Sequence, residues 1–99
     1  MKAVILSLFT LFLVQNAQAC QVAEAQVIGT VIQSDLVGDE CNTLVELDRV
    51  NPHVFCPLNL QVGQRVSILA QKRGARCLLS GEAISGVVQK IGGQLRFDE

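Results

Sequence analysis

The residues of this chain most able to do chemistry are its four cysteines, Cys20, Cys41, Cys56 and Cys77. As free thiols they could act as nucleophiles or metal ligands, whereas in an exported protein they would pair as disulfides. They lie 21, 15 and 21 positions apart, so the sequence has no C-x-x-C pair of the kind found in redox motifs and zinc sites. An even number of cysteines in a short chain therefore predicts two structural disulfides.

Four cysteines allow three pairings, and the order of the expected strands favours one of them. If the first two strands form an antiparallel hairpin, Cys20 precedes the first strand and lies near the end of the second, where Cys56 follows. Cys41 then lies at the turn of that hairpin, close to the start of an antiparallel neighbour that begins at Cys77. We predict the pairs Cys20–Cys56 and Cys41–Cys77.

Beyond the cysteines, the sequence offers few groups for catalysis or metal binding. His53 is the only histidine, and we expect a loop histidine that is solvated or makes one backbone hydrogen bond. Glu46 and Asp48 lie two positions apart and would share one face of a strand, an alternation that exposure to solvent already explains. The sequence has no glycine-rich phosphate loop between a strand and a helix. We therefore predict no catalytic residue, no metal site and no cofactor.

The first nineteen residues have the pattern of an export signal. Lys2 gives a positive start, residues 3–14 are apolar apart from Ser7 and Thr10, and Ala17-Gln18-Ala19 has the small-x-small pattern of a cleavage site. The apolar run is shorter than the roughly 20 residues that cross a membrane as a helix. We expect residues 1–19 to be a signal peptide and residues 20–99 to form one small domain in the periplasm or outside the cell.

Cys20, directly after the expected cleavage site, leaves a lipid anchor open as a second possibility. A bacterial lipoprotein signal usually has Leu three positions before the cysteine and a small residue two positions before it. In this chain Ala17 and Gln18 occupy those two positions. Acylation of Cys20 would also leave three cysteines and so one unpaired thiol. The sequence therefore favours plain export over the lipid anchor.

Charge and aromatic content argue against two classes of ligand. Residues 20–99 hold seven Lys and Arg against nine Asp and Glu, a net charge of −2, because one of the eight basic residues is Lys2. Their only aromatic side chains besides His53 are Phe55 and Phe97. Nucleic-acid binding commonly needs a basic surface with aromatic side chains that stack on the bases. Sugar binding by stacking also needs aromatic side chains. We expect neither, and a partner, if there is one, would be a protein of the envelope or extracellular space.

Short runs of Val, Ile and Leu between Gly and Pro residues predict strands. We expect a first strand over 25–34, bent at Gly29, and a second over 43–50 that Asn51-Pro52 ends. Residues 64–72 alternate with Val66, Ile68 and Ala70 inward, although a short helix is also possible there. The inward residues of the second expected strand are Val45 and Leu47.

The rest of the chain completes the expected sheet. Arg73-Gly74-Ala75 is expected to form a hairpin turn, and 77–91 a long strand that Gly81 and Gly86 bend or break. Gly92-Gly93 is typical of a two-residue hairpin turn, which would place Val88 opposite Phe97.

Five such strands predict an all-β fold, either a small barrel or a rolled antiparallel sheet stapled by two disulfides. The number of strands and the glycine positions resemble the OB-fold. The usual OB-fold helix between the third and fourth strands is missing, because a turn of three residues separates them.

The longest irregular segment, 51–63, contains the stretch where function is most expected, 51–60. Its apolar side chains lie between or directly after two prolines, and Cys56 tethers its middle. A tethered loop on a rigid scaffold loses little entropy on binding, so a partner could be bound through His53, Val54, Phe55 and Leu58. Alternatively, Phe55 and Leu58 plug the open end of the barrel.

These observations predict a non-catalytic binding or structural module in the cell envelope or outside the cell. A secreted protease-inhibitor-like binder that uses loop 51–60 is an alternative. A thiol or redox enzyme is a less favoured alternative, because it would need a free, reactive cysteine.

Overall fold

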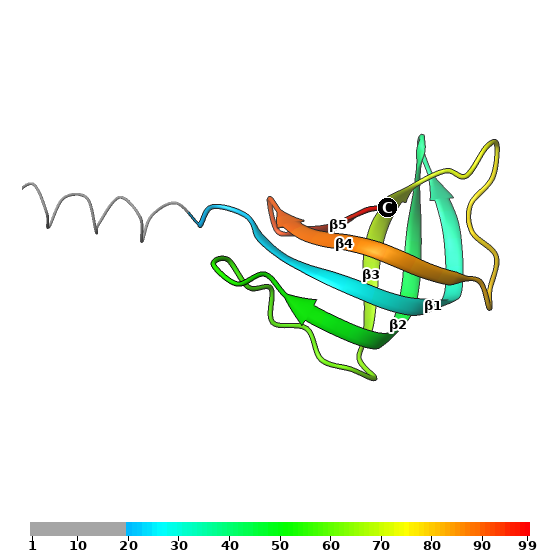
Figure 1. Ribbon diagram of the computed structural model, residues 1–99. Coiled ribbons are helices and arrows are strands. Elements are labelled where there is room, and N and C mark those ends of the chain that lie inside the picture. The colour runs from blue at the N-terminus through cyan, green and yellow to red at the C-terminus, as the bar shows by residue number, and fades with distance from the viewer. Residues whose placement is uncertain (1–19) are drawn as a thin grey trace, which may run out of the picture.

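The computed structural model describes residues 20–99, which form five strands and no helix (Figure 1). The strands are β1 (Ala23–Val37), β2 (Glu40–Pro52), β3 (Arg65–Gln71), β4 (Ala83–Ile91) and β5 (Gln94–Asp98). They close into a barrel in the order β1-β2-β3-β5-β4, and β4 pairs with β1 to complete it. The expected OB-like barrel is confirmed. The expected signal peptide, residues 1–19, lies outside the described residues.

β1 is long and bent because it pairs with β2 along one edge and with β4 along the other, and so closes the barrel. Its first half pairs with β4 and β2, and beyond Thr30 it pairs with β2 alone. The register with β2 shifts between Ile28 and Gly29, which marks a bulge at the bend. A Cβ at Gly29 would lie 2.8 Å from the Glu46 carbonyl oxygen, so the close approach of the two strands requires glycine. The predicted bend at Gly29 is confirmed.

β2 and β3 show the alternation that the sequence indicates. β2 extends further than the predicted 43–50 at both ends and includes Pro52, which pairs with Ala25. The predicted inward residues of both strands are buried: Val45, Leu47, Val66, Ile68 and Ala70. Residues 65–71 are a strand rather than the helix also considered, because alternate side chains face the core.

The predicted strand over 77–91 is partly wrong, because β4 begins at Ala83 and residues 77–82 form a loop. Arg73 and Arg76 bridge a tight turn as expected, but the turn leads into this loop rather than into a strand. Cys77 is bonded to the buried Cys41, and this bond draws the loop over the end of the barrel. Gly81, with φ of 91°, then turns the chain into β4.

The β4–β5 hairpin agrees with the prediction. Gly92 and Gly93 have φ values of 59° and 80°, as a two-residue turn of the I′ type requires. Val88 pairs with Phe97, and both side chains are buried. β5 also meets β3 in parallel, through Leu69 and Arg96, whereas the other four strand pairs are antiparallel.

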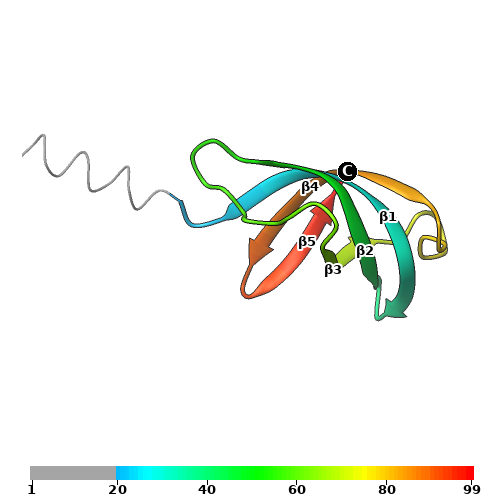
Figure 2. The ribbon, with the colours of Figure 1, turned by 90° about the horizontal axis from the view of Figure 1, so that it is seen from below.

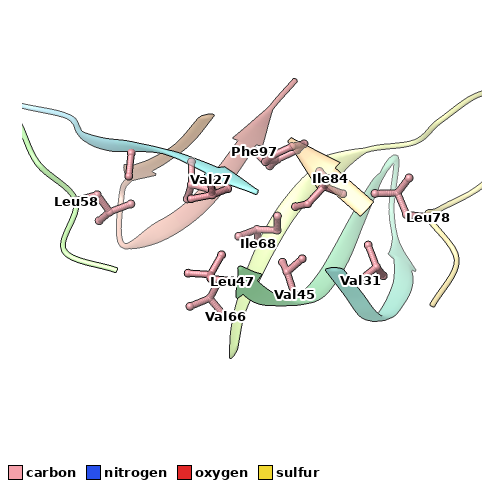
Figure 3. Packing of buried hydrophobic residues seen from close by; sticks show 13 residues of the cluster. Val27, Val31, Val45, Leu47, Leu58, Val66, Ile68, Leu78, Ile84 and Phe97 are labelled. Carbon is pink, nitrogen blue, oxygen red and sulfur yellow. The ribbon is translucent and has the colours of Figure 1, made fainter. Parts of the chain in front are cut away.

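The core fills the barrel and is closed at each end by a leucine from a loop. Leu58 follows β2 and Leu78 follows β3, and Figure 3 shows them at opposite ends of the cluster. The other buried apolar residues come from the strands: Ala25, Val27, Val31, Val45, Leu47, Val66, Ile68, Ala70, Ile84, Val88 and Phe97.

Both predicted disulfides are present, Cys20–Cys56 and Cys41–Cys77, each closing 36 positions of chain. A loop of this size loses about 4 kcal/mol of chain entropy in the unfolded state. Each disulfide lies within two positions of a leucine that closes an end of the barrel. Two disulfides are consistent with an oxidising, exported environment.

Candidate functional site

The loop between β2 and β3, residues 53–64, is the long irregular segment that the sequence singled out. It folds back beside the N-terminal end of β1, where Pro57 forms a parallel bridge with Glu24 (Figures 1 and 2). The Cys20–Cys56 disulfide joins the loop to the residues that precede β1. The loop is thus held at its middle as well as at its two ends.

The main chain of Glu24 anchors the loop. Its N–H donates to the Cys56 carbonyl at 2.9 Å, and its carbonyl accepts from the N–H groups of His53 at 3.0 Å and Leu58 at 3.1 Å. These bonds satisfy backbone groups that a loop of this length would otherwise leave to solvent. The turn from His53 to Leu58 is therefore part of the folded scaffold.

His53 supports the tip of the loop from inside. Its Nδ1 accepts hydrogen bonds from the N–H groups of Phe55, at 3.2 Å, and Cys56, at 3.1 Å. A ring nitrogen that accepts carries no proton, so these two hydrogen bonds place the ring proton on Nε2. Nε2 lies 3.6 Å from the Glu24 carboxylate, which also accepts from the Gln89 side chain at 3.3 Å. The predicted loop histidine thus bonds two backbone donors rather than one.

The four predicted contact residues divide into two groups. Val54 and Phe55 are 86% and 79% exposed, and the exposed His53 ring lies 6.0 Å from the Phe55 ring. Leu58 is 8% exposed and belongs to the core. The barrel-plug interpretation therefore fits Leu58 and does not fit Phe55, which points an apolar ring into solvent.

Two shallow hollows lie beside this loop on the outer face of β4, β1 and β2. The first, about 390 Å³, is lined by Glu24, Ala25, Gln26, Asn51, Pro52, His53, Val54, Phe55 and Val87. The second, about 560 Å³, is lined by Gln26, Val27, Ile28, Arg49, Val50, Asn51, Val62, Ser85 and Gly86. They share Gln26 and Asn51, so they form one continuous surface.

The sequence pattern alone does not indicate that this outer face is a candidate contact surface. Ile28 and Val62 are 41% and 66% exposed and line the second hollow. The alternation of β1 carried part of the signal, because Gln26 and Ile28 lie between the buried Ala25, Val27 and Gly29. Val62 had no such signal, since its place depends on how the loop returns to β3.

The other groups considered for chemistry have structural partners. Each cysteine of residues 20–99 is in a disulfide. Glu46 lies 3.9 Å from Arg65, and Asp48 accepts a hydrogen bond from Thr30 Oγ1 at 2.9 Å. The two carboxylates therefore have separate partners.

Within residues 20–99, no helix has the length and apolar character to cross a membrane, and no three His, Cys, Asp or Glu side chains are grouped to hold a metal ion. Comparison with known proteins finds no family model, no curated protein and no solved structure that matches this chain.

Proposed function

We propose that this protein is an exported, non-catalytic binding or structural module whose contact surface is the tip of loop 51–60. The observation that carries the proposal is the exposure of Val54 and Phe55 on a loop held by a disulfide and by hydrogen bonds to Glu24 and His53. An ordered loop keeps these side chains in place before binding, so little entropy is lost when a partner covers them.

The form of the tip favours contact through side chains over protease inhibition. A loop that imitates an extended peptide offers its main-chain hydrogen bonds to the partner. Here the N–H groups of Phe55 and Cys56 are already donated to His53. We therefore place a general protein-binding module ahead of the inhibitor-like alternative.

A thiol enzyme would need a reduced cysteine, and in residues 20–99 all four are joined as disulfides. The sulfur of Cys20 is bonded to that of Cys56, which supports plain export over acylation of that sulfur. We propose the periplasm or the outside of the cell as the location, from the pattern of residues 1–19 and the two disulfides.

A photo-crosslinking amino acid at position 55 tests the contact surface in the producing cells. We expect it to give one defined crosslinked protein, and the same group at the exposed Leu79, in the loop before β4, to give none. The crosslinks at both positions would be identified by mass spectrometry. The same products from both positions, or none from position 55, would contradict the proposed surface.

A further inference from the structure

The outer face beside the loop is a regular grid of side chains on three strands. β1 lies between β4 and β2, and the register places Gln26 next to Val87 on one side and Asn51 on the other (Figure 1). We call Val87, Gln26 and Asn51 the centre row. It runs across the strands, and the two hollows lie on either side of it.

Each side of the centre row has a hollow, and one side also has the projecting loop tip. On one side, next to Glu24, the loop tip projects Val54 and Phe55 into solvent. On the other side, Ile28 pairs with Arg49 in register and, with Val62, lines the larger hollow. An apolar projection and an apolar hollow thus lie on one surface, separated by the centre row.

We propose that this face binds a second copy of the same chain about a two-fold axis along the centre row. The inference rests on the proposed function, because it names the partner of the same loop tip. A two-fold axis in the plane of the face superposes one side of the row on the other, as an isologous interface requires. Phe55 of each copy then enters the hollow formed by Ile28, Arg49 and Val62 of the other.

The charges on the two sides are also complementary. Glu24 lies on the side of the projection and Arg49 on the side of the hollow. Within residues 20–99, no carboxylate is within ion-pair distance of Arg49. The axis brings each Arg49 toward the Phe55 ring and the Glu24 carboxylate of the other copy, where a guanidinium is favourable on both counts.

The centre row suits the axis itself. Gln26 and Asn51 are exposed and adjacent, and each amide both donates and accepts hydrogen bonds. A residue on a two-fold axis meets its own copy or a close neighbour, so amides can pair there without a like-charge contact. A different protein would have to supply a matching projection, hollow and charges, whereas a second copy already has them.

Sedimentation velocity of the purified, oxidised protein over a concentration series tests the inference through two charge reversals. Arg49→Glu and Glu24→Arg should each weaken self-association several-fold, because each places like charges opposite one another twice. An equimolar mixture of the two variants should associate at least as tightly as the unchanged protein, since both contacts become attractive again. Circular dichroism should show that both variants keep the barrel.

Phe55→Ser provides a second test that leaves the charges alone. We expect dimer dissociation to become easier by about a hundredfold or more, because the variant removes two buried aromatic rings, one from each copy. Leu79→Ser, which removes an exposed apolar residue elsewhere, should leave association unchanged. Two results would overturn the inference. One is that the unchanged protein stays monomeric at a protein concentration of about 0.5 mM, because a specific dimer would form well below that concentration. The other is that the mixture of the two charge variants associates no better than either variant alone. A heterologous crosslink at position 55 with a monomeric protein would overturn the dimer and leave the proposed contact surface standing.

Discussion

His53 holds the loop tip through the ring nitrogen that faces the main chain. Two N–H donors converge on its Nδ1, from Phe55 and Cys56, while the other nitrogen faces Glu24. The side chain thus completes a bend that the backbone alone would not close. Together with the Glu24 main chain and the Cys20–Cys56 disulfide, this acceptor holds the backbone from which the exposed Phe55 ring projects.

Replacing His53 with Ala should loosen the tip without unfolding the barrel. Two exposed N–H groups lose their partner, so the free energy of unfolding should fall by only about 1 kcal/mol. Amide hydrogen exchange at Phe55 and Cys56 should become faster, while exchange in β1 stays slow. His53→Asn restores a short side-chain acceptor and should recover part of the protection. Unchanged exchange at both amides in the Ala variant would show that the hydrogen bonds to Nδ1 do not hold the tip.

Gly86 is the glycine at which an added side chain would come closest to other atoms of the barrel. A Cβ there would lie 2.4 Å from the Asp98 carbonyl oxygen and 2.9 Å from the Glu99 Cα, both of them backbone atoms. Gly86→Ala must therefore displace the end of β5, and we expect a loss of about 1–3 kcal/mol. Urea denaturation would measure it, with the neighbouring exposed Ser85→Ala as control. Equal midpoints for the two variants would contradict the close packing of β5 on β4.

The two disulfides hold loops at opposite ends of the barrel, and the two disulfides differ in how deeply they are buried. Cys20 is exposed and Cys41 is 1% exposed, whereas their partners Cys56 and Cys77 are both half-buried, so Cys20–Cys56 is the more exposed of the two disulfides. A reductant reaches an exposed sulfur first. The loop that carries Phe55 is therefore the one whose tether is open to reduction.

Mild reduction should open Cys20–Cys56 before Cys41–Cys77. Alkylation during a reductant titration, followed by peptide mapping, would show the order. The partly reduced protein should keep the barrel by circular dichroism and lose the ordered loop tip, while full reduction should unfold it, since each bridge opposes about 4 kcal/mol of chain entropy. Labelling of Cys41 before Cys20 would contradict the arrangement.

Much of each strand could be predicted because local pattern and tertiary structure agree there. Gly29 marks the bend, Val66, Ile68 and Ala70 alternate, and Gly92-Gly93 turns the last hairpin. The loop 77–82 is not evident from the sequence even with Cys77 paired to Cys41, because the pattern of 77–91 does not show that pairing with β1 begins only at Ala83. Nor is the division between Phe55 and Leu58 evident, since both are apolar loop residues and only the path of the chain decides which one is buried.

For the molecule as a whole, closure of the sheet limits how it can bind. Free strand edges remain where β3 and β5 meet at the single pair Leu69–Arg96 and along β1 beyond Thr30, but the paired edges leave most contacts of a partner to loops and outer faces. Leu58 and Leu78 pack into the core at opposite ends of the barrel (Figure 3). The face between the loop tip and β4 carries the exposed side chains of Val54, Phe55, Ile28 and Val62 beside two adjoining hollows.

In loop 51–60 we propose a division of roles, in which Leu58 closes the core and Phe55 makes contacts. Comparing Phe55→Ala with Leu58→Ala, in unfolding and in binding to the second copy or to a crosslinked partner, tests it most directly. We predict that Phe55→Ala changes the free energy of unfolding by less than about 0.5 kcal/mol and weakens association about tenfold or more. Leu58→Ala should cost about 2–5 kcal/mol of stability. A Phe55→Ala variant that loses several kcal/mol of stability and keeps its affinity would show that Phe55 stabilises the fold and makes no contact with a partner.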